Sequence, residues 1–112
     1  MTSETQGQEV RKAHNEALFR DANESVRAVQ RDLGMPDGLM PFICECEDPE
    51  CRTIVRLTPA AYEGIRSDAT QFFIAPGHPS NGRVIEELPT YSVVKKSGVS
   101  AEIAIETDPR KD

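Results

Sequence analysis

The chain has 112 residues, a formal net charge of −6, 5% aromatic residues and no tryptophan. A chain of this length forms one domain with a small hydrophobic core, and a bound metal commonly stabilises such a core. The acidic balance argues against nucleic-acid binding, which generally needs a basic face for the phosphates, and no apolar run is long enough to cross a membrane.

Residues 1–8 are polar and are predicted to form a disordered arm. The beginning of the chain, MTSETQGQEV, lacks a basic segment followed by an apolar one, so we do not expect it to be a signal peptide. We expect a cytoplasmic protein, whose thiols stay reduced.

Residues 9–33 are predicted to form one long helix. Its apolar residues recur every three or four positions and form a stripe of Phe19, Ala22, Val26, Val29 and Leu33. The opposite, exposed face is expected to carry the charged residues Arg11, Lys12, Glu16, Arg20, Glu24 and Arg31. Gly34 can then end the helix in a left-handed conformation. We interpret the stripe as packing on the domain's own sheet. A short coiled-coil seam is the alternative, but the stripe covers about two heptads where three or four are usual.

A hairpin is predicted to follow this helix. Strand-like runs at 41–43 and 53–57 flank a turn at Asp48-Pro49-Glu50, so the cysteines between them are expected at the hairpin tip. Thr58 can cap a second helix that starts with Pro59 and runs to about Arg66.

The rest of the chain is predicted to be mainly β-structure. Residues 71–75 are predicted as a strand, and residues 83–87 and 91–95 as a strand pair joined around Pro89. Residues 99–106 fit either a strand or a short helix, and residues 107–112 are expected to form a flexible tail.

Three cysteines lie close together in the pattern Cys44-x-Cys46-x4-Cys51, and this odd number suits metal ligation better than disulfides. Zinc takes four sulfur or nitrogen ligands in a tetrahedron, and His78, in a proline-flanked loop, is the predicted fourth ligand. His14, on the long helix, is an alternative fourth ligand.

Two other interpretations of the cysteines are reduced core residues beside a surface histidine, and a redox-active group. Both are disfavoured by the acidic residues around the cysteines, which are unlike a core and raise the pKa of a nearby thiol. These residues are Glu45, Glu47, Asp48 and Glu50.

A zinc ion held by three thiolates and one imidazole has no open position for a substrate, so we expect a structural zinc and no enzymatic activity. The motifs of zinc hydrolases and P-loop enzymes are absent from the sequence. The expected fold class is α+β. A single zinc-stapled domain over residues 9–106 would contain the long helix at 9–33, a zinc-tipped hairpin, a short helix and a small antiparallel sheet.

Basic residues on the predicted hairpin and strands are a further candidate site. They are Arg52, Arg56, Arg83, Lys95 and Lys96. The favoured interpretation is ordinary edge-strand charge, which discourages association between sheets.

From about residue 10 onward, the chain shows a distinctive order of segments. They are NEALFRDANESVRAV, FICECEDPECRTIVRLTPAAYEGIR, PGHP, VIEELPTYSVVKKSG and ETDPRKD. With these segments the chain resembles a family of small uncharacterised actinobacterial proteins, and the CEC-x4-C and PGH motifs are the most specific elements. The resemblance implies Cys44, Cys46, Cys51 and His78 as shared metal-type residues, and it implies no activity.

The first functional hypothesis is an intracellular protein-interaction or regulatory module, whose zinc fixes a surface for a protein partner. We expect a monomer, or a weak dimer through the N-terminal helix, and no membrane association. The second hypothesis is a nucleic-acid-binding transcriptional regulator that uses the basic residues of the sheet. The third is a thiol/zinc redox sensor.

Overall fold

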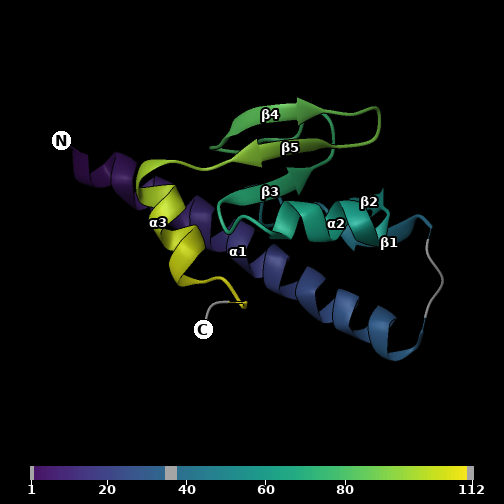
Figure 1. Cartoon of the computed structure of the whole chain (residues 1–112). Coiled ribbons are helices and arrows are strands. Elements are labelled where there is room, and N and C mark those ends of the chain that lie inside the picture. The colour runs from purple at the N-terminus through teal and green to yellow at the C-terminus, as the bar shows by residue number, and fades with distance from the viewer. Residues whose placement is uncertain (1, 35–37, 111–112) are drawn as a thin grey trace.

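The computed structural model describes residues 2–34 and 38–110 (Figure 1). Within these residues the chain forms three helices and five strands. Their bounds are α1 Thr2–Asp32, β1 Met40–Ile43, β2 Ile54–Leu57, α2 Pro59–Arg66, β3 Gln71–Ile74, β4 Arg83–Glu87, β5 Ser92–Lys95 and α3 Gly98–Glu106. The predicted α+β class is confirmed, although the strands form two small antiparallel sheets instead of one.

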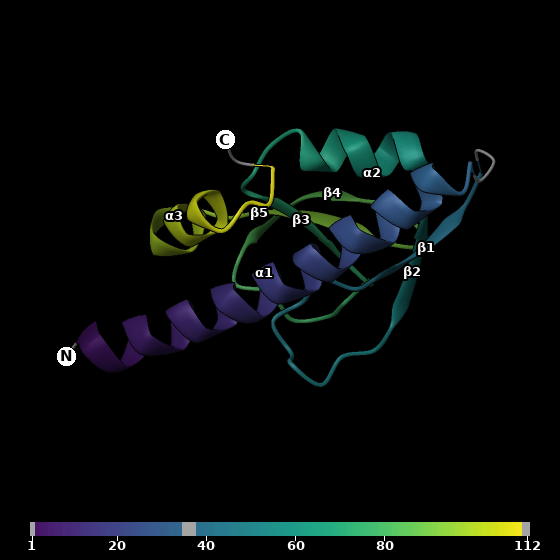
Figure 2. The same ribbon diagram turned by 90° about the horizontal axis from the view of Figure 1, so that it is seen from below.

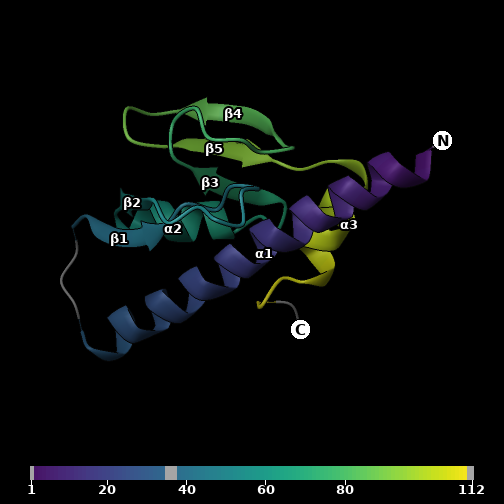
Figure 3. The ribbon, with the colours of Figure 1, turned by 180° about the vertical axis from the view of Figure 1, so that it is seen from behind.

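The first sheet is the β1–β2 hairpin, in which Met40 lies opposite Leu57 and Ile43 lies opposite Ile54. The second sheet has the strand order β3-β5-β4, so β5 is its central strand. The β4–β5 hairpin lies at the side of the molecule away from α1 (Figures 1 and 3). The predicted hairpin and the predicted strand pair are therefore both present.

The core lies where β1, α2 and β3 meet. The rings of Phe42 and Tyr62 are stacked with their centroids 4.4 Å apart, and Phe73 meets both rings edge-on at 6.1 and 6.0 Å. Val55 and Val94, from one strand of each sheet, are buried in the same cluster. Half of the six aromatic residues of the chain thus form this cluster.

A disordered arm is predicted over residues 1–8, whereas in the structure α1 begins at Thr2. The first turns of α1 extend beyond the rest of the molecule (Figure 2). Extending an existing helix avoids the costly nucleation step, and the Glu and Gln residues of this segment have good helix propensity. The polar composition of residues 2–8 is therefore compatible with a helix as well as with a disordered arm. Met1 lies outside the described residues. At the other end, Gly34 has the expected left-handed conformation, with φ of +63°.

The face of α1 that packs against the rest of the molecule is largely polar. The predicted apolar stripe is therefore confirmed only in part: Phe19 and Val26 pack against the core at the edge of this face. Val29 and Leu33, expected to be packed, are 55% and 70% exposed. Glu16 and Arg20, expected on the exposed face, are completely buried. The helix is therefore rotated relative to the orientation that its apolar residues predict.

Hydrogen bonds explain why these charged side chains are buried. Arg20 donates to the carbonyl oxygens of Ala69 and Ala104 at 2.7 and 2.8 Å. Glu16 accepts a hydrogen bond from the ammonium group of Lys96, which is also buried. Apolar periodicity cannot reveal such contacts, because each charged group is hydrogen-bonded to a partner far away in the sequence.

Local sequence signals correctly predict the second helix. The Thr58 hydroxyl accepts the N–H of Ala61 at 3.1 Å and caps α2, which spans the predicted residues. Residues 99–106, which fitted either a strand or a helix, belong to α3. This helix packs beside α1 and buries Ser100 and Ala104 (Figure 2).

Residues 107–112 are predicted as a flexible tail, and in the structure this segment makes ion pairs as far as Arg110. Asp108 forms an ion pair with Arg66, and Arg110 forms ion pairs with Glu24 of α1 and Glu63 of α2. Charged side chains on two helices hold this segment, and its polar composition gives no sign of them. Residues 111–112 lie outside the described part of the chain.

Candidate metal centre

The four predicted ligands reach one place from three segments of the chain. Cys44 and Cys46 follow β1, Cys51 ends the turn before β2, and His78 lies in the loop between β3 and β4. The N–H of Cys44 donates to the carbonyl of Thr53 at 2.9 Å, which extends the hairpin pairing beyond its strands. The hairpin therefore brings its three cysteines to one end, as the sequence predicts.

Backbone contacts fix the loop that carries the histidine. Gly77 has φ of +78°, a left-handed conformation that favours glycine, and it lets the chain bend before His78. The N–H of His78 donates to the carbonyl of Ala75 at 3.1 Å. The N–H of Glu47 donates to the carbonyl of Pro79 at 3.1 Å, which joins this loop to the cysteine-bearing segment.

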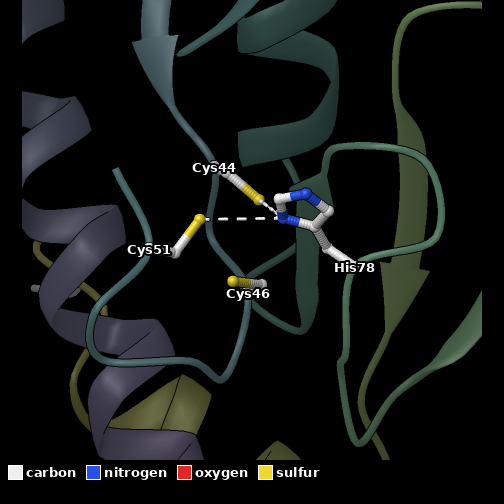
Figure 4. Close-up of side chains that lie close together, drawn as sticks. All are labelled: Cys44, Cys46, Cys51 and His78. Atoms are coloured by element: carbon white, nitrogen blue, oxygen red, sulfur yellow. Dashed lines mark hydrogen bonds between the residues drawn. The ribbon is translucent and has the colours of Figure 1, made fainter. Parts of the chain in front are cut away.

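The four ligand atoms all lie within 4.8 Å of one another. Nδ1 of His78 is 3.5 Å from Sγ of Cys44 and 3.7 Å from Sγ of Cys51, and the sulfur of Cys46 lies beside them (Figure 4). In a tetrahedral zinc site, with bonds of about 2.3 Å to sulfur and about 2.0 Å to nitrogen, these atoms are about 3.6 Å apart. The three cysteines form no disulfide. The group can therefore hold one metal ion.

Backbone amides are directed at the sulfur atoms. The N–H of Ala75 donates to Sγ of Cys44 at 3.2 Å. The amides of Asp48 and Thr53 are hydrogen-bonded to the other two sulfurs. Such bonds favour the thiolate over the thiol, and the thiolate is the form that binds a metal.

Burial opposes ionisation of these thiols when no cation is nearby. Cys44 and Cys46 are completely buried, and burial raises the pKa of both thiols despite the amide hydrogen bonds. Burial acts in the same direction on Cys51, but hydrogen bonds from Thr53 lower its pKa overall. A coordinated thiol is deprotonated by the charge of the ion. Buried thiols that already accept amide hydrogen bonds are therefore suited to a bound cation.

Sequence reasoning missed the role of the carboxylate between the first two cysteines. Glu45 was expected to be one of the residues that make this segment unlike a core, but it is completely buried, and burial raises its pKa to about 7. Its carboxylate accepts hydrogen bonds from the side chain of Asn23 at 2.8 Å and from the N–H of Phe73 at 3.3 Å. No local signal could identify this contact, since Asn23 is 22 residues away in the sequence.

The alternative fourth ligand, His14, does not lie at this site. It is exposed on α1 and is not part of the group formed by the three cysteines and His78. The proline-flanked loop, and not the helix, supplies the imidazole that approaches the sulfurs.

The five basic residues do not form one exposed patch. Lys96 is buried in an ion pair, and Lys95 is paired with a carboxylate. Arg52 and Arg56 belong to the β1–β2 hairpin, whereas Arg83 is in β4 of the other sheet. These side chains are divided between two sheets and between exposed and buried positions, so the structure does not join all five in one basic site.

The fold and the site together define a small α+β protein with a largely buried Cys3His group. No protein-family model matches the chain, and no curated protein or solved structure matches it. The resemblance to small actinobacterial proteins therefore remains a prediction. Among residues 2–34 and 38–110, no helix combines the length and the apolar character needed to span a lipid bilayer.

Proposed function

We propose that this chain is a zinc-binding protein in which Cys44, Cys46, Cys51 and His78 hold one structural zinc ion. The observation that carries the proposal is the convergence of three sulfur atoms and one imidazole nitrogen, from three separate segments, within 4.8 Å. Tetrahedral sets of thiolate and imidazole ligands favour zinc among divalent cations. The amide hydrogen bonds to the sulfurs support the same assignment.

A structural role follows from the number and type of ligands. Four protein ligands complete a tetrahedron and leave no position for water or substrate, and three thiolates also weaken the ion as a Lewis acid. We therefore propose no enzymatic activity for this centre. Zinc would join the hairpin to the β3–β4 loop and contribute on the order of 10 kcal/mol to folding, as in zinc-finger peptides.

The function that we propose for the zinc-stabilised fold is that of a protein-interaction or regulatory module. Several large apolar side chains are exposed on α1, just after it and just before β1, namely Leu18, Val29, Leu33 and Leu39. A groove of about 410 Å³ between these elements is lined by Ser25, Val26, Val29, Gln30, Met40 and Pro41. Exposed apolar surface beside a groove favours a protein partner.

Two other functions receive less support. Nucleic-acid binding would have to rely on three arginines, since Lys96 is buried and Lys95 is already paired, on a chain with a net charge of −6. A redox sensor needs accessible thiols, but Cys44 and Cys46 are completely buried. A cytoplasmic location, where thiols stay reduced, suits the proposed centre.

Native mass spectrometry combined with elemental analysis tests the zinc proposal. We expect one zinc ion per chain, and we expect His78→Ala to bind zinc much more weakly. His14→Ala is the matched control, because it removes an exposed histidine outside the group and should leave zinc binding unchanged. A native chain without affinity for zinc, or a His78→Ala variant with native affinity, would contradict the proposal.

A further inference from the structure

Helix α1 supplies none of the four ligands, yet its buried polar face holds the segment that carries two of them. The side chain of Asn23 is completely buried. Its Nδ2 donates to the carbonyl of Ile43 at 2.7 Å and to the carboxylate of Glu45 at 2.8 Å, and its Oδ1 accepts the N–H of Ile43 at 2.7 Å. Asn23 therefore pairs with the edge of β1 as a neighbouring strand would, directly before Cys44.

Glu45 extends this contact to β3. Its carboxylate accepts the N–H of Phe73 at 3.3 Å, and its own N–H donates to the carbonyl of Phe73 at 3.0 Å. Alternate residues of an extended segment face the same side. Here Cys44 and Cys46 face His78, while Glu45 between them faces α1. The position of this one carboxylate therefore constrains where both sulfurs lie.

We infer that Asn23 and Glu45 are positioning residues for the metal centre. Their buried hydrogen bond holds Cys44 and Cys46 in the ligating arrangement before the metal binds, and this raises the affinity of the site. The inference rests on the proposed function, since it concerns the same centre. Groups that orient the ligands of a metal commonly affect its affinity 10–100-fold, that is, by about one to two orders of magnitude.

The coupling must act in both directions. If the docking of α1 raises the affinity for the metal, the bound metal strengthens the docking of α1 by the same factor. Metal binding thus affects how firmly α1 is docked, and the exposed apolar side chains of this helix form part of the proposed interaction surface.

The zinc affinity of the full chain, measured by competition with a chromophoric chelator, tests this inference. Asn23→Asp keeps the size of the side chain but turns its donor into a carboxylate that faces Glu45, so we expect an affinity roughly 10–100-fold lower. Adding Glu45→Gln restores a donor and an acceptor with their positions exchanged. The double variant should therefore recover part of the lost affinity.

Arg20→Met is the matched control. Arg20 is completely buried on the same helix, but it donates to the carbonyls of Ala69 and Ala104, which lie outside the ligand-bearing segments. The melting temperature of the Arg20→Met variant should fall. Its zinc affinity and the absorption spectrum of its Co²⁺ form should stay close to those of the native protein. Asn23→Asp should shift that spectrum, because the geometry of two sulfur ligands changes.

Native zinc affinity in Asn23→Asp would overturn the inference. Equal losses in Asn23→Asp and Arg20→Met, without recovery in the double variant, would overturn it as well. If Asn23→Asp does not fold, Asn23→Ser removes the same amide donor without adding a charge and allows the same comparison with Arg20→Met. A native chain that binds no zinc would contradict the proposed function itself, which is a different result from weakened binding in the variants.

Discussion

The aromatic cluster formed by β1, α2 and β3 and the interface between α1 and the rest of the chain are stabilised by different forces. In the cluster, Phe42 and Tyr62 stack at 4.4 Å, and both are completely or almost completely buried. At the interface, Glu16, Arg20 and Asn23 are equally buried, but they are held by hydrogen bonds and an ion pair. The same chain thus combines a conventional apolar core with a polar one.

The difference matters because the two kinds of contact respond differently to small shifts. Dispersion and the hydrophobic effect are non-directional, so an apolar cluster tolerates slight rearrangement. A buried donor or acceptor that loses its partner costs about 1–3 kcal/mol, so a polar interface depends on correct geometry. The metal centre lies between the two regions, since Cys44 and Cys46 belong to the core cluster while Glu45 contacts α1.

Removing the metal should have the largest effect. We expect a strong chelator to lower the free energy of unfolding by on the order of 10 kcal/mol and to loosen residues 42–80, because the hairpin and the β3–β4 loop lose their common ligand. Hydrogen exchange with and without zinc measures this, and readdition of zinc should restore protection. Unchanged circular dichroism and melting temperature after verified metal removal would refute a structural role.

Breaking the buried ion pair of the polar interface should cause the next largest loss of stability. Lys96→Met removes the partner of the buried Glu16 carboxylate and should cost about 3–5 kcal/mol, since it leaves an unpaired buried charge. Chemical denaturation with excess zinc measures the loss. Adding Glu16→Leu removes the remaining charge, and the double variant should recover much of the stability. A neutral effect of Lys96→Met alone would show that the interface does not depend on this pair.

Tyr62 contributes to both the aromatic cluster and the α1 interface. Removing its hydroxyl alone, or its whole side chain, measures the two contributions separately. The hydroxyl donates to Glu24 of α1 at 2.5 Å, while the ring stacks in the aromatic cluster. Tyr62→Phe keeps the ring and should cost about 1.5 kcal/mol, the lower end for a hydrogen bond to a charged group, because Glu24 retains its arginine partners. Tyr62→Ala also removes the ring and should cost about 3–5 kcal/mol. Equal losses in both variants would contradict this division.

The same hydroxyl predicts a dependence on alkaline pH. Burial and the neighbouring Glu24 raise the pKa of Tyr62, so the native phenol keeps its proton at pH values where an unfolded tyrosine, with a pKa of about 10, loses it. The native state then binds more protons than the unfolded state, and stability falls as the pH rises above about 10. Denaturation at several alkaline pH values should show a smaller fall for Tyr62→Phe.

The parts of the molecule that the sequence predicts well are those set by neighbouring residues or by residue type alone. The Thr58-Pro59 start of α2 needs only its own turn, and three cysteines with one loop histidine define a ligand set by their chemistry. The burial of Glu16 and Arg20 could not be predicted, because their partners are 80 and 84 residues away. Long-range polar pairs leave no periodic signal, so apolar periodicity found Phe19 and Val26 at the edge of the buried face of α1 but not the polar residues at its centre.

An exposed ion pair gives the smallest expected effect and completes the contrast with the buried one. Lys95 lies 2.5 Å from Asp68, with side chains 39% and 35% exposed. Lys95, together with Thr70, lowers the pKa of Asp68 to about 2, so the pair contributes above the unfolded pKa of about 3.9 and is lost as the pH falls through about 2. Asp68→Asn keeps an oxygen for the Thr70 N–H but loses the charge and the acceptor for Lys95, and solvent screening should limit the cost to less than about 1 kcal/mol. Acid also releases zinc from thiolates, so the test is urea denaturation at neutral pH, in low and in high salt. The difference in the free energy of unfolding between the variant and the native chain should become smaller as salt is added. A loss as large as that of Lys96→Met would mean that burial does not set the strength of charge pairs in this protein.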